Sequence, residues 1–202
     1  RMALSNITLT AGMRANLLSL QNTASLFDTT QTRLATGKKV NTALDDPIAY
    51  FAAKGYMDRA NDLSGLKDNM NEAIQIVKAA DAGITAIEDL IAQAKSLANS
   101  ALATANTTER ASYATQFGNL RTQIDALASD AIYKGTNLLA DGALSVIFNE
   151  GSTSSLTISG FAASTTGLSI DAAANSWAAD TDIQGAITDL DGASSTLRTE
   201  SK

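Results

Sequence analysis

Apolar residues recur at heptad spacing between residues 13 and 34, and this repeat restricts the first segment of the chain to a long helix. The stripe consists of Met13, Leu17, Leu20, Ala24, Phe27 and Leu34, with Gln31 at its one gap. Alternating steps of three and four residues align side chains along one face of a helix. A lone helix with one apolar face is marginal in water, so the stripe needs a covering partner. No downstream segment is an obvious mate, and we expect a neighbour outside this sequence.

A second apolar stripe predicts a helix over residues 47–103. Asp46 can cap this helix, and Pro47 suits the first helical position. Three glycines weaken the expectation of a continuous helix, since each costs about 1 kcal/mol in a helix interior. These glycines are Gly55, Gly65 and Gly83.

Two shorter stripes predict a third helix over residues 108–134 and a fourth from residue 182 onwards. Thr107 or Thr108 can cap the third helix, and Gly135 is expected to end it. The fourth stripe still continues where the sequence stops, so we expect a truncated helix there. The residues expected in the rod core are Ile74, Val77, Ile84, Ile87, Ile91, Phe117, Leu120, Ile124 and Leu127.

Residues 141–181 differ in character from the helical stripes. Two β-prone runs, residues 144–148 and 156–161, are separated by turn residues and predict a β-hairpin. Gly37 is expected to end the first helix, with residues 37–46 as a connector. The predicted fold is therefore mainly α: an elongated rod of long, antiparallel, coiled-coil-like helices with a small β-hairpin region.

The composition argues against several classes of function. The chain has no His and no Cys, which removes the usual zinc ligands, disulfides and Ser–His triads. A net charge of -6 and a pI near 4.6 disfavour nucleic-acid binding. No apolar run reaches the 18 or more residues of a membrane span. We therefore expect that the protein is not an enzyme and holds no metal or other cofactor. We also expect that it binds neither nucleic acid nor a membrane.

Two further candidates have simple structural explanations. Asp45 and Asp46 are adjacent carboxylates, but no further ligands lie nearby in the sequence, so a capping role is favoured over a metal or catalytic dyad. Trp177 is the only Trp. It could anchor a contact with a partner, although local packing is the favoured role.

The segment from Arg33 to Pro47 resembles a signature of bacterial flagellins. It reads RLATGKKVNTALDDP. Residues 2–7 (MALSNI) and 132–139 (IYKGTNLL) are similar to two further flagellin segments, although Tyr-Lys stands where Phe-Asn is usual. On these motifs the chain is identified as a member of the flagellin family, of the short alphaproteobacterial type, without the C-terminal helices. The signature residues are Arg33, Leu34, Gly37, Asn41, Asp45 and Asp46.

The resemblance implies a role as a self-assembling structural subunit of the bacterial flagellar filament, an extracellular organelle of swimming motility. The implied partners are other flagellin subunits, the flagellar type III export apparatus, and the hook-associated and cap proteins. The implied regions are an inner-tube helix (2–36), a spoke (37–46), a rod domain (47–140), a hairpin region (141–181) and the start of a C-terminal rod helix (182–202).

The resemblance also locates the family's contact region for Toll-like receptor 5 near the end of the second helix. Gln93 and Ser96 stand where enteric flagellins have Arg and Glu, and Lys95 and Leu97 lie beside them. We expect weak or no activation of this receptor. Two alternatives remain open: a hook–filament junction protein, and a flagellin-like surface protein that binds polysaccharide.

Overall fold

The computed structural model describes residues 10–202, which divide into two compact units between Asn61 and Asp62. The division falls inside helix α2 (Pro47–Leu102), so one helix contributes to both units. The other elements are α1 (Ala11–Thr36), α3 (Thr107–Asp130), β1 (Ala143–Ile147), β2 (Ser155–Ser159), the short 3-10 helix η1 (Ala174–Trp177) and α4 (Asp180–Glu200). The predicted mainly helical fold with a small β-hairpin is confirmed.

Helix α1 has both of its ends defined by local chemistry. The Oγ1 of Thr10 accepts a hydrogen bond from the amide of Met13 at 3.4 Å, which caps the first turn. The helix ends at Thr36, and Gly37 follows in the left-handed conformation with φ 66°, as a glycine stop requires. The MALSNI stretch of residues 2–7 lies outside the described residues.

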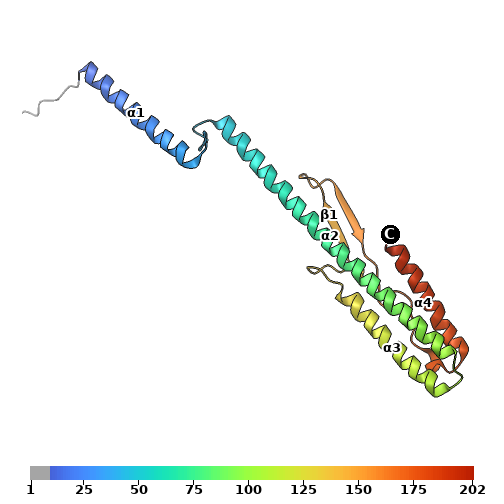
Figure 1. The fold of residues 1–202 in the computed structure, drawn as a ribbon. Helices are drawn as coiled ribbons and strands as arrows, with labels where there is room; N and C mark the ends of the chain where they lie inside the picture. The colour runs from blue at the N-terminus through green and yellow to red at the C-terminus, as the bar shows by residue number, and fades with distance from the viewer. Residues whose placement is uncertain (1–9) are drawn as a thin grey trace, which may run out of the picture. The chain divides into compact units, whose positions relative to one another are not determined.

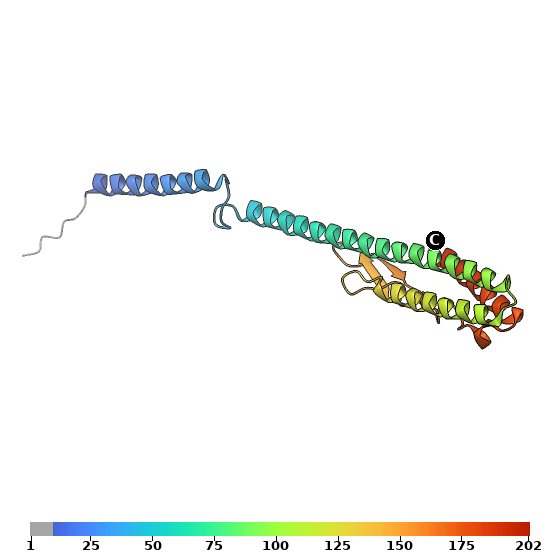
Figure 2. The ribbon, with the colours of Figure 1, turned by 60° about the horizontal axis from the view of Figure 1, so that its bottom comes forward.

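The second unit is built on the later half of α2. Figures 1 and 2 show α3 and α4 lying alongside this part of the helix, with the hairpin beside it. Its core consists largely of Ala, Ile and Leu from the three helices, closed by the loop around Trp177. Residues of α2 at the seam include Ala73, Ile76, Ala80, Ile84, Ile87, Ile91, Ala94, Ala98 and Ala101.

The predicted core positions Ile74 and Val77 are wrong. Ile74 is 51% exposed and Val77 is 39% exposed, whereas Ala73 and Ile76 are buried. An α-helix has 3.6 residues per turn, so a strict heptad stripe drifts around it, and an extra step of four residues corrects the drift. That step falls between Ala80 and Ile84, which puts the seam one residue earlier than we predicted.

The other predicted core residues lie at or near the seam. Ile84, Ile87, Ile91, Phe117 and Ile124 are buried, and Leu120 and Leu127 are partly buried against the same core.

The ends of α3 differ from the prediction. Asn106, and neither Thr107 nor Thr108, caps the helix: its Oδ1 accepts hydrogen bonds from the amides of Thr108 (3.0 Å) and Glu109 (3.4 Å). The helix ends at Asp130, before Gly135. The side chain of Asn137 explains the earlier end, because its Nδ2 donates to the last carbonyls at Ala128 (2.7 Å) and Ser129 (3.1 Å).

The hairpin pairs β1 and β2 antiparallel, with Leu144 opposite Ile158 and Val146 opposite Leu156. These four residues share one face of the pleat. Leu144 and Ile158 pack against the helical core, and Val146 is buried. At the base of the hairpin, a Cβ on Gly160 would lie 2.1 Å from the carbonyl oxygen of Leu138, so only glycine fits there.

Candidate assembly surfaces

The predicted stripe of α1 is exposed along its whole length. Its large side chains, from Met13 to Leu34, are between 48% and 84% exposed, and no residue of α1 is buried. Ala24 is exposed as well. Isolated apolar side chains are normal on protein surfaces, but a contiguous apolar strip of this kind is typical of an interaction surface.

Helix α1 carries a second apolar site that our heptad analysis missed. Leu18 and Leu26 are 62% and 71% exposed. With 3.6 residues per turn, both project from the side of the helix opposite the stripe. The signal in the sequence is two leucines eight residues apart, which lie outside the heptad stripe. Helix α1 therefore offers apolar contacts in two directions.

The first turns of α2 extend the apolar surface of the first unit. Ile48, Phe51, Tyr56 and Met57 are all exposed, as is Leu44 just before the helix. The rings of Tyr50 and Phe51 meet edge to face with centroids 5.6 Å apart. No residue between Thr10 and Asn61 is buried, so this unit has no core of its own.

The connector is ordered by the carboxylate of Asp45. Its Oδ2 accepts hydrogen bonds from the amides of Thr42 (2.9 Å) and Asn41 (3.0 Å) and from the Thr42 hydroxyl (3.2 Å). These backbone donors, that of Thr42 first, lower the pKa of Asp45 below its ordinary value. The Nδ2 of Asn41 in turn donates to the carbonyl of Lys38 at 3.2 Å. The signature thus encodes a folded turn.

Asp46, the neighbour of Asp45, has a separate task. Its Oδ1 accepts a hydrogen bond from the amide of Ala49 at 3.0 Å and caps α2, as predicted. Both carboxylates therefore accept hydrogen bonds from backbone amides. Within residues 10–202, no cluster of three or more Asp, Glu, His or Cys side chains is arranged to hold a metal ion.

An apolar groove in the second unit is lined by the two side chains that we wrongly predicted to lie in the core. Ile74 and Val77 of α2 lie there with Phe148 and Leu156 of the hairpin region. The groove has a volume of about 350 Å³, and Lys78 is its only charged lining residue. The phase shift of the α2 seam thus turns two expected core residues into an exposed apolar surface.

The residues of the predicted receptor region have mixed roles. Lys95 forms an ion pair with Asp191 and so joins α2 to α4. Leu97 is partly buried against the helical core. Gln93 lies in a shallow groove with amide side chains of α3, among them Gln116 and Asn119. Only Gln93 of the three is exposed and without a structural task in the described part of the chain.

None of the helices within residues 10–202 has the length and apolar character that crossing a bilayer requires. The candidate assembly surfaces are the exposed apolar faces described above, together with the ordered connector.

Comparison with known proteins agrees with these features. The family described as the bacterial flagellin N-terminal helical region matches residues 7–143. Flagellin FljK of Caulobacter vibrioides is 32% identical over 142 residues, which are 70% of this chain and 52% of the relative. A flagellin of Listeria monocytogenes is 26% identical over 110 residues, covering 54% of this chain and 38% of that protein. The chain thus spans about half the length of the Caulobacter relative.

The fold is also similar to a solved structure. The crystal structure of Bacillus cereus flagellin superposes with a TM-score of 0.57 at 21% sequence identity. The superposition covers 67% of this chain and 79% of that one. At this level of identity the similarity concerns the fold alone.

Proposed function

The chain belongs to the bacterial flagellin family, and we propose that it is a structural subunit of the flagellar filament that assembles with other copies through the apolar faces of its first unit. The observation that carries the proposal is the exposure of α1: its apolar stripe, and the two leucines opposite, are all uncovered. Flagellins are structural proteins in general, and we propose no enzymatic role.

The energy available from covering α1 supports this proposal. Full burial of one Leu, Phe or Met side chain stabilises by about 1.5–3 kcal/mol. The stripe and the opposite leucines together hold seven such side chains, namely Met13, Leu17, Leu18, Leu20, Leu26, Phe27 and Leu34. Because a lone helix is marginal in water, with its ordering cost nearly offset by its own interactions, even partial burial of this set favours the covered state. Contacts that use different surfaces of the same subunit generate open filaments when they do not close into a ring.

The finer partners follow from family membership and are part of the proposal. We propose export through the flagellar type III apparatus, contact with hook-associated and cap proteins, and an extracellular location in the filament. We also propose weak or no activation of Toll-like receptor 5, because Gln93 replaces the enteric Arg and Lys95 is engaged by Asp191. A reporter-cell assay with potency equal to that of an enteric flagellin would refute this last point.

A polymerisation assay with two matched α1 variants tests the proposal. Phe27→Ser removes the largest side chain of the stripe, whereas Thr30→Ser alters an exposed residue whose hydroxyl only bonds the carbonyl of Leu26. Seeded polymerisation of the gene product is followed by light scattering and electron microscopy. We expect Phe27→Ser to raise the critical concentration about tenfold or more and Thr30→Ser to leave it unchanged. Equal critical concentrations for both variants would refute assembly through α1.

Labelling in cells separates a filament subunit from a junction protein. Antibodies raised against this chain are applied to intact flagella and viewed by electron microscopy. A filament subunit gives label along the whole filament, whereas a junction protein gives label only where hook and filament meet. Label confined to that junction would replace the filament proposal by the junction alternative.

A further inference from the structure

The segment just before α4 has a strained backbone. Asn175, Ser176 and Trp177 have φ values of 45°, 52° and 61°, and none of them is glycine. The left-handed region is unfavourable for L-residues because the Cβ approaches the following carbonyl oxygen. Three such residues in succession persist only where surrounding contacts hold them in place.

One holding contact is the side chain of Trp177. It is fully buried, and its ring lies 4.9 Å from the ring of Phe117 of α3. The indole Nε1 is buried without a hydrogen-bond partner among the described residues. A buried donor without a partner is unfavourable, since in solvent water would accept its hydrogen bond. Burial of Trp177 thus holds the segment in place, but the unpaired indole N–H makes this buried arrangement less favourable.

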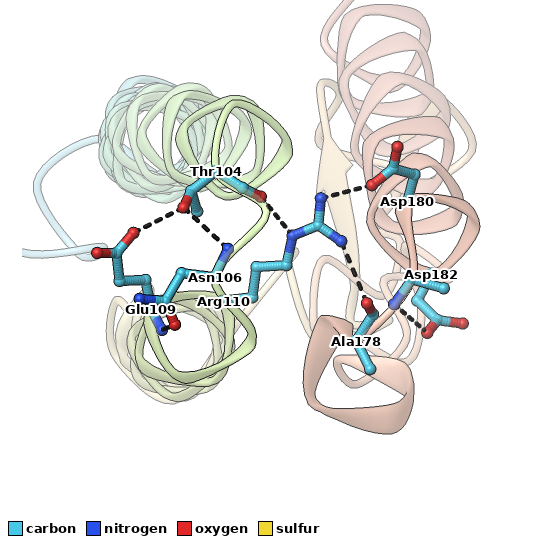
Figure 3. Close-up of polar contacts among 8 residues, drawn as sticks. Thr104, Asn106, Glu109, Arg110, Ala178, Asp180 and Asp182 are labelled. Carbon is cyan, nitrogen blue, oxygen red and sulfur yellow. Dashed lines mark hydrogen bonds and ion pairs between the residues drawn. The ribbon is translucent and has the colours of Figure 1, made fainter.

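The second holding contact is Arg110, the one buried charged residue among residues 10–202. Figure 3 shows its guanidinium between the α2–α3 turn and the start of α4. Its Nε donates to the carbonyl of Thr104 at 2.7 Å, and its two terminal nitrogens donate to the carbonyl of Ala178 (3.2 Å) and the carboxylate of Asp180 (2.5 Å). One side chain thereby joins the turn to the residues that begin α4.

Capping of α4 adds little to this arrangement. Ala179 precedes the helix and has no side-chain acceptor, so half of a capping box is missing. The remaining half is the carboxylate of Asp182, which accepts from the Ala179 amide at 3.3 Å. The buried residues in the first two turns of α4 are Ile183 and the small Ala186. Arg110 and Trp177 thus hold the segment before α4, together with a long hydrogen bond from Asn175 Nδ2 to the Asp182 carboxylate at 3.4 Å.

We propose that residues 174–180 form a strap that is closed by Arg110, and that opening of the strap releases the first turns of α4 while α2 and α3 stay paired. The asymmetry follows from connectivity: α2 and α3 are joined by the short turn after Leu102 and share a large apolar seam. Helix α4 packs on that seam too, but along the chain it is connected to α2 and α3 through the strap. Backbone strain and the unpaired indole N–H favour opening, whereas burial of the Trp177 ring and the three Arg110 hydrogen bonds oppose it. This inference does not depend on filament assembly.

Hydrogen exchange on the full chain tests the strap. Arg110→Gln removes the fork of donors, and Arg198→Gln is the control, since Arg198 is an exposed arginine at the other end of α4. We expect Arg110→Gln to speed exchange of the amides of residues 184–190 at least tenfold in low denaturant. The amides of residues 117–124 in α3 should change less than twofold, because opening is local. The control should match the wild type.

Two further variants keep the test decisive. Arg110→Lys keeps the charge but loses the fork, so residues 184–190 should exchange at least threefold faster than in the wild type. Adding Ser176→Gly to Arg110→Gln relieves strain at a positive φ and should slow that exchange at least threefold. Wild-type exchange in both Arg110 variants would overturn the proposal. Equal acceleration in α2, α3 and α4 would also overturn it, because the opening would then be global.

Discussion

Helices α1 and α4 have the same kind of apolar stripe and opposite environments. The stripe of α4 is buried at Ile183, Ala186, Leu190, Ala193 and Leu197, whereas α1 buries none of its residues. Both sequences specify a helix with an apolar stripe along one side, and this much follows from spacing alone. Whether that side meets a partner within the chain depends on the rest of the fold. A heptad stripe therefore predicts a need for a neighbour without identifying that neighbour.

The largest expected effect is a contrast between equivalent leucines of the two helices. Leu190→Ala should destabilise the second unit by about 3 kcal/mol, because it empties a fully buried site. Leu20→Ala should change the stability of the isolated chain by less than about 0.5 kcal/mol, because Leu20 is mostly exposed. The fluorescence of Trp177, the only Trp, reports urea unfolding of the second unit. Equal shifts of the midpoint in both variants would contradict the division into a packed and an unpacked helix.

Two glycines of α2 should respond with opposite signs. A Cβ at Gly83 would lie 2.6 Å from Cδ1 of the buried Leu139 and 3.1 Å from the Cβ of Ala131. We expect Gly83→Ala to destabilise by about 1–2 kcal/mol through overpacking. At Gly65 nothing lies within 4 Å, so Gly65→Ala should stabilise by about 0.5–1 kcal/mol through helix propensity. Thermal unfolding followed by circular dichroism measures both, and stabilisation by both alanines would show that Gly83 is not at a close contact.

The sequence was most informative where a local rule decides the structure. Gly37 ends α1 and Asp46 caps α2 as predicted, because both effects depend on a few adjacent residues. The two β-prone runs paired for a similar reason, since a short turn brings neighbouring segments together. In the later half of α2, Ile84 and Ile87 were placed correctly because the stripe there keeps a regular step.

The sequence was least informative where several segments meet. The additional four-residue step from Ala80 to Ile84 shifts the buried face of α2 and leaves Ile74 exposed. This shift depends on how α2 packs against two partner helices, which a single apolar stripe does not reveal. Arg110 has no signal in the sequence, because Ala178 and Asp180, which accept its hydrogen bonds, lie far along the chain. The inner-tube role of the α1 stripe and the spoke role of the connector stay predictions until an assembly is examined.

The connector of the first unit offers a pH-dependent contrast. The pKa of Asp45 is lowered by the amides of Thr42 and Asn41. A carboxyl with a lowered pKa stabilises the folded turn above its ordinary value of 3.8 and loses that contribution as pH falls through the lowered pKa. We therefore expect the amide resonances of Asn41 and Thr42 to shift together below pH 3.8. Asp45→Asn should abolish this shared transition, and its persistence in that variant would show that another group controls the turn.

The smallest expected effect lies in the second unit, at the ion pair between Lys134 and Glu72. The Nζ of Lys134 lies 3.0 Å from the Glu72 carboxylate, and both groups are in contact with solvent. The hydrogen bond and the charge of Glu72 raise the pKa of Lys134 above 10.5. A raised pKa contributes stability below the ordinary value and loses it as pH rises through the folded value, so loss of the Lys134 proton weakens the pair only in strong alkali.

Glu72→Gln removes the negative charge of this pair and leaves the core around it unchanged. We expect the variant to return the pKa of Lys134 toward 10.5, as measured by NMR titration of its side chain. The urea midpoint should hardly move, because solvent screens exposed ion pairs. Glu88→Gln, elsewhere on α2, should leave the Lys134 titration unchanged. A large loss of stability from Glu72→Gln would mean that a surface ion pair fixes the loop after α3. The packed unit would then owe part of its order to charge, as the connector of the first unit does.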